Sequence, residues 1–156
     1  SELFSSIRLV RNLRAEAGLR PSQEVPVRFV TSKIALSQIL KKAEADIRIL
    51  TRAKNVDVFS PQELEGLPLE KVLVGVSGEL EVILPIEGLV DVEALRNRLE
   101  KDLNKAEAEI NSLSGRLSNP NFTQKAPNSI VLECRTRLSE AETQAEIVRS
   151  RLLGLD

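Results

Sequence analysis

The feature that most constrains the fold is a pair of regular apolar patterns within residues 91–156. In each pattern apolar residues recur every three or four positions, which places them along one side of an α-helix. The positions are Val92, Leu95, Leu99, Leu103, Ala106, Ile110, Leu113 and Leu117, then Val131, Cys134, Leu138, Ala141, Ala145, Val148, Leu152 and Leu155. This near-regular alternation of three and four is typical of the buried seam of a coiled coil. Each pattern therefore predicts a long helix that packs along a partner.

The segment between the two patterns, residues 118–127, predicts a reversal of the chain. Pro120 and Pro127 prevent one continuous helix from running through it. Two seams of similar length with a short break between them predict an antiparallel two-helix coiled coil. Each helix, at about 27 residues, would be roughly 40 Å long. Little of the chain could pack against the far end, so we expect it to contact another molecule.

Residues 1–90 predict a smaller layer of strands and helices. An apolar stripe predicts a helix over 3–17 that ends at Gly18. Period-two alternation and turn residues predict strands over 24–31, 55–59, 71–76 and 79–84, with a helix over about 33–53 and a short helical turn at Ser60–Glu63. Pro26 favours an edge strand or a strand start, and Ser77-Gly78 favours a tight hairpin turn.

These patterns together predict an α+β fold with three parts. Residues 1–19 form a terminal helix, residues 20–90 form a β-α-β-β-β layer, and residues 91–156 form the helical hairpin. A layer of about 70 residues is near the lower limit for an independent core. We therefore expect it to lean on the first helix or on the base of the hairpin.

The composition argues against catalysis by this chain alone. There is no His, Trp, Tyr or Met, and Cys134 is the only cysteine. The lack of His removes Ser-His and Cys-His nucleophilic sites and the usual zinc sites, and no glycine-rich phosphate loop is present. Cys134 falls on a seam, so we expect a buried structural thiol. We predict neither a metal nor a cofactor for these residues.

The net charge and the lengths of the apolar runs indicate where in the cell the protein is found. The formal net charge is −1, so the chain as a whole is not a basic surface for nucleic acid. No apolar run is long enough to cross a membrane, and no signal peptide begins the sequence. We expect a cytoplasmic protein without membrane contact. Since the sequence has no initiator Met, we also expect it to be part of a longer protein.

The reversal and its flanks have an unusual charge pattern. No Asp or Glu occurs from Ile110 to Leu132, whereas Arg116 and Lys125 do. The same stretch holds Asn119 and Phe122. Cations, amides and one ring suit an RNA surface, but a reversal loop in which Phe122 covers the end of the seam explains the same residues. A structural or protein-binding hairpin without RNA contact is therefore the alternative interpretation.

Arg8, Arg11 and Arg14 form a second charged feature, because their spacing places them on one side of the first predicted helix. A solvated face, or ion pairs with residues such as Glu16, would account for them. Contact with a phosphate backbone is the other interpretation.

Three segments resemble the C-terminal end of bacterial-type valyl-tRNA synthetases. They are Arg11-Asn-Leu-Arg-Ala-Glu-Ala-Gly18, Leu89-Val-Asp-Val-Glu-Ala-Leu95 and Leu117-Ser-Asn-Pro-Asn-Phe-Thr-Gln-Lys-Ala-Pro127. The third, followed by a second seam helix, is the most specific to the valine enzymes. The resemblance covers essentially the whole chain in the same order.

The resemblance implies tRNA as a partner, specific for valine in the complete enzyme, together with the rest of the synthetase, and it implies a monomer. In that family the first helix closes the anticodon-binding helical domain, and the coiled-coil arm reaches the outer corner of tRNA, where the D and T loops meet. The residues it implies at the tip are Arg116, Asn119, Phe122 and Lys125. Lys101, Lys105 and Arg135 are the implied backbone contacts along the arm.

The sequence also departs from the complete family pattern. A chain without His or Met has neither the His-x-Gly-His signature nor the Lys-Met-Ser-Lys-Ser loop, and the editing domain is missing too. The resemblance therefore implies a non-catalytic fragment, with ATP bound by the catalytic part of the synthetase.

Overall fold

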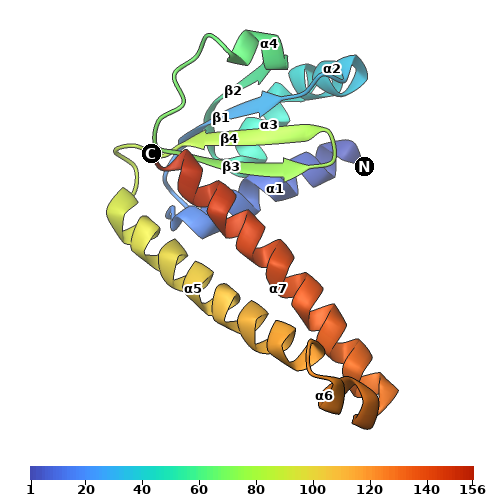
Figure 1. The fold of residues 1–156 in the computed structure, drawn as a ribbon. Coiled ribbons are helices and arrows are strands. Elements are labelled where there is room, and N and C mark those ends of the chain that lie inside the picture. The colour runs from blue at the N-terminus through green and yellow to red at the C-terminus, as the bar shows by residue number, and fades with distance from the viewer. The chain divides into compact units, whose positions relative to one another are not determined.

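A four-stranded mixed sheet organises the first part of the chain, in a computed structural model that describes residues 1–156. The residues form two compact units, Ser1–Leu95 together with Gly154–Asp156, and Arg96–Leu153. The elements of the first unit are α1 (Glu2–Ala17), β1 (Val25–Val30), α2 (Ile34–Lys42), α3 (Glu44–Thr51), β2 (Ala53–Phe59), α4 (Pro61–Leu64), β3 (Val72–Ser77) and β4 (Leu80–Pro85) (Figure 1). The predicted α+β class and the four strands are confirmed.

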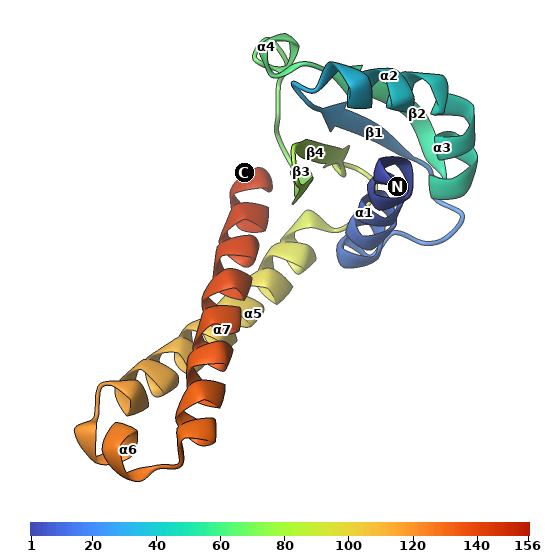
Figure 2. The same ribbon diagram turned by 90° about the vertical axis from the view of Figure 1, so that its right-hand side faces the viewer.

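The strand order is β2-β1-β4-β3, with β1 parallel to β2 and antiparallel to β4. α1, α2 and α3 pack on the sheet and cover one of its faces (Figure 2). Val27, Phe29 and Val82 are among its fully buried residues. At Gly75 an added Cβ would lie 2.9 Å from Leu13 Cδ1, so α1 packs closely on β3. The sheet is thus packed against the first helix, as expected from the sequence. Gly18 ends that helix in the left-handed conformation, with φ 77°.

The single helix predicted over 33–53 is wrong, because α2 and α3 are separate helices that meet at Ala43, with φ −91° and ψ 11°. A straight helix of that length would extend about 30 Å, whereas a strand of six residues spans about 20 Å. The break keeps Leu40 and Ile47 buried on the sheet, while Ile39 is 40% exposed. Sequence periodicity did not reveal it, since no Gly or Pro marks the position.

Two smaller differences concern backbone details. β1 is a central strand, so Pro26 does not mark an edge; it lies at the start of the strand, where the pairing with β2 shifts register. In the hairpin Ser77 pairs with Leu80, so the two turn residues are Gly78 and Glu79. Gly78 has φ 59°, a conformation that glycine adopts without steric cost.

The predicted capping box at α4 is present. The Ser60 hydroxyl accepts a hydrogen bond from the Glu63 backbone N–H at 3.2 Å, and the Glu63 carboxylate accepts one from the Ser60 N–H at 3.0 Å. The backbone hydrogen bond from Ser60, followed by the one from its side chain, lowers the pKa of Glu63. Because the ionised form is favoured in the folded state, its contribution to α4 is present above the ordinary pKa of Glu and is lost as the pH falls through the lowered pKa.

We expect the Ser60→Ala variant to raise the pKa of Glu63 toward the ordinary value for a glutamate, because the hydroxyl that orders the pair is removed. Titration of the Glu63 carboxyl by NMR measures this directly. Ser60→Thr keeps the hydroxyl and should leave the pKa low. Equal titration of Glu63 in the native chain and in both variants would contradict this account.

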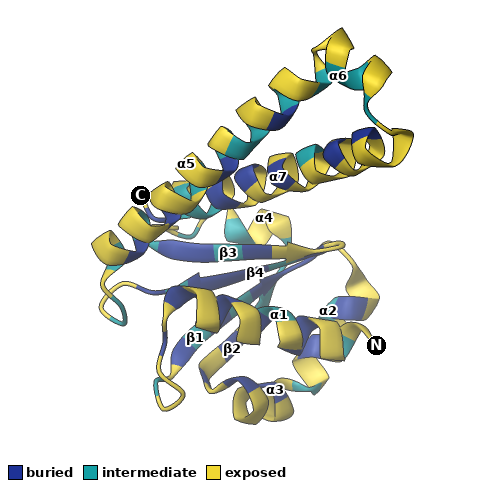
Figure 3. Ribbon diagram, turned by 90° about the horizontal axis from the view of Figure 1, so that it is seen from below, coloured by how far each residue is buried: buried dark blue, intermediate teal, exposed yellow.

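The second unit contains most of α5 (Val92–Leu117), all of α6 (Pro120–Lys125) and all but the last residue of α7 (Asn128–Gly154). Every position of the two predicted seams is buried or half-buried, and none is exposed. The buried positions lie where α5 and α7 approach each other (Figure 3). Arg137 of α7 pairs with Glu109 of α5 at 3.0 Å, and Arg149 pairs with Glu107 at 3.3 Å. Because the number of the α7 partner rises as that of the α5 partner falls, the two helices are antiparallel.

The last residues of the chain belong to the first unit. Leu155 is fully buried, and a Cβ on Gly154 would lie 2.5 Å from the carbonyl oxygen of Val72 in β3. A side chain at position 154 would therefore force the backbone to shift. None of the helices in the structure is both long and apolar enough to cross a membrane.

Candidate nucleic-acid interface

The end of α5, α6 and the start of α7 form the acid-free end of the second unit, residues 110–132, which we call the tip. α5 ends at Leu117, as the sequence predicts, but the reversal contains the short helix α6. The Asn119 side chain caps α6 by accepting a hydrogen bond from the Asn121 N–H at 3.0 Å, and Pro120 occupies the first helical position. Asn followed by Pro is a recognisable helix start, so the sequence carried a signal for α6 that we missed.

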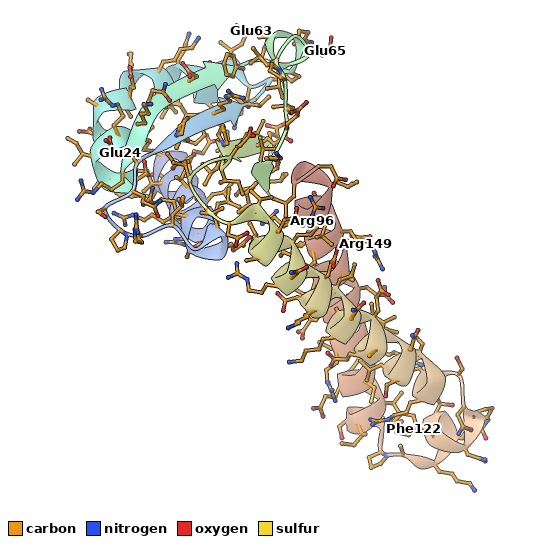
Figure 4. All side chains as sticks on the ribbon, turned by 90° about the vertical axis from the view of Figure 1, so that its left-hand side faces the viewer. Glu24, Glu63, Glu65, Arg96, Phe122 and Arg149 are labelled. Carbon is orange, nitrogen blue, oxygen red and sulfur yellow. The ribbon has the colours of Figure 1, made fainter.

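The four residues implied at the tip lie together there. Arg116, Asn119 and Lys125 are exposed, and Phe122 is half-buried. Figure 4 shows Phe122 at the far end of the helical hairpin. The cap occupies the side-chain carbonyl of Asn119, which leaves its NH₂ group as a hydrogen-bond donor. The tip thus presents cations and a donor together, beside one partly covered ring.

Neither tip cation is neutralised by an acid. Arg116 and Lys125 take part in no ion pair, and the nearest polar partner of Arg116 is the buried Cys134, whose Sγ lies 4.0 Å from Nη1. Both side chains are therefore available to an anion from outside the chain.

The three residues implied along the arm are exposed but lie apart. Arg135 is in the third turn of α7, not far from the tip. Lys105 lies about 18 Å before the end of α5, and Lys101 lies about 24 Å before it. A ligand that covers only the tip would not reach these lysines.

Seven cations of the second unit fall into two classes. Arg137 and Arg149 are used in ion pairs between α5 and α7. The five candidate cations, Arg116, Lys125, Lys101, Lys105 and Arg135, form no ion pair. Sequence inspection could not separate these classes, since the pairing depends on how the two helices are aligned.

No group of three or more His, Cys, Asp or Glu side chains is arranged to hold a metal ion in the structure. The charged and amide side chains of the tip are hydrogen-bond donors of the kind that suits an anion such as phosphate.

Known proteins match this chain in two ways. Residues 91–156 match the family model described as the valyl tRNA synthetase tRNA binding arm. The valine–tRNA ligase of Prochlorococcus marinus strain SARG is 63% identical over 99% of the chain. The corresponding ligase of Thermosynechococcus vestitus is 36% identical over 100% of it. The chain spans about 17% of the length of each of these relatives.

The two matches agree on one family, since the relatives align with essentially the whole chain and the family model covers the helical hairpin. The resemblance noted for the three segments is thereby confirmed. The chain belongs to the valyl-tRNA synthetases and corresponds to their C-terminal region.

Proposed function

We propose that this chain is a tRNA-binding region of a valine–tRNA ligase, in which α5 and α7 form a coiled-coil arm whose tip contacts the outer corner of the tRNA. The observation that carries the proposal is the acid-free tip, where Arg116 and Lys125 are exposed and have no ion pair. The match of residues 91–156 to a family named for tRNA binding supports it.

The tip would bind mainly through phosphates. The guanidinium of Arg116 and the ammonium of Lys125 suit phosphate oxygens, and the amide of Asn119 suits a sugar or a base edge. Phe122 is half-buried, so one ring face would pack on the tip while the other meets RNA. Lys101, Lys105 and Arg135 are proposed as weaker backbone contacts for a tRNA that extends along the arm.

Few contacts would suffice because the arm is part of a larger enzyme. Two or three phosphate contacts bind weakly alone and weaken steeply with salt. Joined to the rest of the synthetase, they become intramolecular and add to the overall affinity. A rigid arm loses little entropy on binding. We propose that the seam and the Arg137–Glu109 ion pair provide this rigidity.

In this proposal each of the three parts predicted from the sequence has its own role. Residues 1–19 would complete an anticodon-binding helical domain, residues 20–90 would connect it to the arm, and residues 91–156 would be the arm. ATP and valine would bind in parts of the enzyme outside these residues, so this region would contribute binding and no chemistry.

The experiment that tests the proposal is a titration of the 156-residue chain with valine tRNA and with an unrelated tRNA, at low and at moderate salt. We expect binding of both tRNAs that weakens by about 10-fold or more as salt rises, because phosphate contacts dominate and the elbow is common to tRNAs. Absence of binding at low salt would contradict the proposal for the chain alone and favour a structural or protein-binding hairpin.

A further inference from the structure

Arginines of two helices come together on the first unit. The Arg11 Nε donates a hydrogen bond to the Leu50 carbonyl at 3.0 Å, so the arginine row of α1 lies beside the C-terminal end of α3. Arg52 ends α3 and is close enough to Arg14 for their charges to repel. The set, which we call the α1–α3 arginine surface, consists of Arg8, Arg11, Arg14, Arg48 and Arg52.

The acids near this surface do not form ion pairs with it. None of its five arginines takes part in an ion pair, although α3 carries Glu44 and Asp46 in its first turn. Four of the five are exposed. The carbonyl ends of α1 and α3 offset part of the positive charge, but Arg8 lies in the middle of its helix, out of reach of that effect.

Arg14 shows that the local charge is costly. It is only 8% exposed; its Nη2 donates to the Arg20 carbonyl at 2.9 Å, while Nη1 is buried without a hydrogen-bond partner. Burial is the main reason why the pKa of Arg14 is lowered, and repulsion from Arg52 lowers that pKa further. A bound anion near Arg52 would relieve that repulsion.

The backbone of Arg52 is also strained. Its φ of 57° is left-handed, where Gly or Asn would be unstrained. The left-handed residue closes α3, where its backbone N–H donates to the Arg48 carbonyl, so a glycine at position 52 would keep the helix end and relieve the strain.

We propose that the α1–α3 arginine surface binds RNA phosphates, as a second contact area of the tRNA that the tip holds. The proposal rests on the proposed function. Arginine suits this role because its planar fork donates two parallel hydrogen bonds to a phosphate. The exposed members of the surface include no aromatic residue to stack on a base, so the contact would read the backbone and not the sequence.

The test uses the double variant Arg48→Gln and Arg52→Gly in the complete chain, titrated with tRNA across a range of salt concentrations. Glycine at position 52 relieves the left-handed strain, and glutamine at 48 keeps a good helix former, so the melting temperature should stay the same or rise. We expect the Kd for tRNA at low salt to rise by about 5-fold, and the slope of log K against log salt to fall by about 0.7–0.9 for each lost contact.

The matched control is Lys41→Gln with Lys42→Gln, which removes the same charge from two exposed lysines of α2. It should change the Kd by less than about 2-fold, because it leaves the arginine surface intact. An equal effect of the control, or a loss of affinity that accompanies a lower melting temperature, would overturn the proposal. So would an unchanged Kd in the Arg48/Arg52 variant.

A parallel variant separates this proposal from the function it rests on. If charge reversal at Arg116 and Lys125 weakens binding while the Arg48/Arg52 variant binds normally, the second contact area is refuted and the tip assignment stands. If the chain does not bind tRNA at low salt, both fail together.

Discussion

We expect the Ala106→Asp variant to lose the helical structure of residues 96–153. Ala106 is 7% exposed on the buried side of α5. Position 106 is part of the seam, so a carboxylate there would be removed from water. An unpaired buried charge costs about 3 kcal/mol or more, which is a large part of the stability of a small unit. Circular dichroism at 222 nm and hydrogen exchange of α5 and α7 would measure the loss.

The same helix provides a matched control. Ala108 is exposed, two residues further along α5. Ala108→Asp carries the same helix-propensity penalty, about 0.6 kcal/mol, without burying the charge. We expect it to leave the helical signal intact and to lower the melting temperature by a few degrees. If both variants melted alike, burial of the Ala106 side of α5 would not be what holds the helices together.

Charge reversal at the tip, Arg116→Glu with Lys125→Glu, should weaken tRNA binding by about 10- to 100-fold at low salt. Each charge-assisted contact with a phosphate contributes about 1–1.5 kcal/mol in an exposed site, and 1.4 kcal/mol corresponds to about tenfold in Kd. The new carboxylates would also repel the backbone. Neither side chain forms an ion pair in the free chain, and the only α5–α7 contact that the reversal removes is the long one from Arg116 Nη1 to Cys134 Sγ, at 4.0 Å. Binding titrations at two salt concentrations would measure it.

The difference between native and reversed chains should shrink as salt rises, since screening weakens both attraction and repulsion. Lys41→Glu with Lys42→Glu applies the same change of charge on the first unit and controls for the overall charge of the protein. Equal affinity of the native and tip-reversed chains would refute the tip as an RNA contact.

The helices and strands that the sequence predicted well are those with long, regular apolar patterns. The bounds of α1 agree with the predicted helix to within one residue, and the positions of α5 and α7 were predicted from their seams. These helices were predictable because burial on one side repeats along the whole element. The break at Ala43 was missed because its cause is tertiary: two short helices pack on the sheet where one long helix would overshoot it. Strand order was likewise out of reach, since pairing partners are chosen by contacts distant in sequence.

The candidate site shows the same limit. Counting acids along the chain was enough to find the tip, because Ile110–Leu132 is contiguous. It was not enough to find the α1–α3 arginine surface, whose members Arg14 and Arg52 are separated by a strand and two helices. The sequence showed the row on α1, but its neighbours became visible only once α3 was placed beside it.

The division of the first unit into Ser1–Leu95 and Gly154–Asp156 has a consequence for synthesis on the ribosome. Val72 of β3 is made about 80 residues before Gly154, which lies against its carbonyl, and at typical translation rates that interval is about 4–16 s. During this time β3 lacks the cover that Gly154 and Leu155 later provide. The sheet therefore reaches its finished state only after the whole arm has been translated, so a nascent chain stalled within the arm would carry an incompletely packed sheet, a natural target for chaperones.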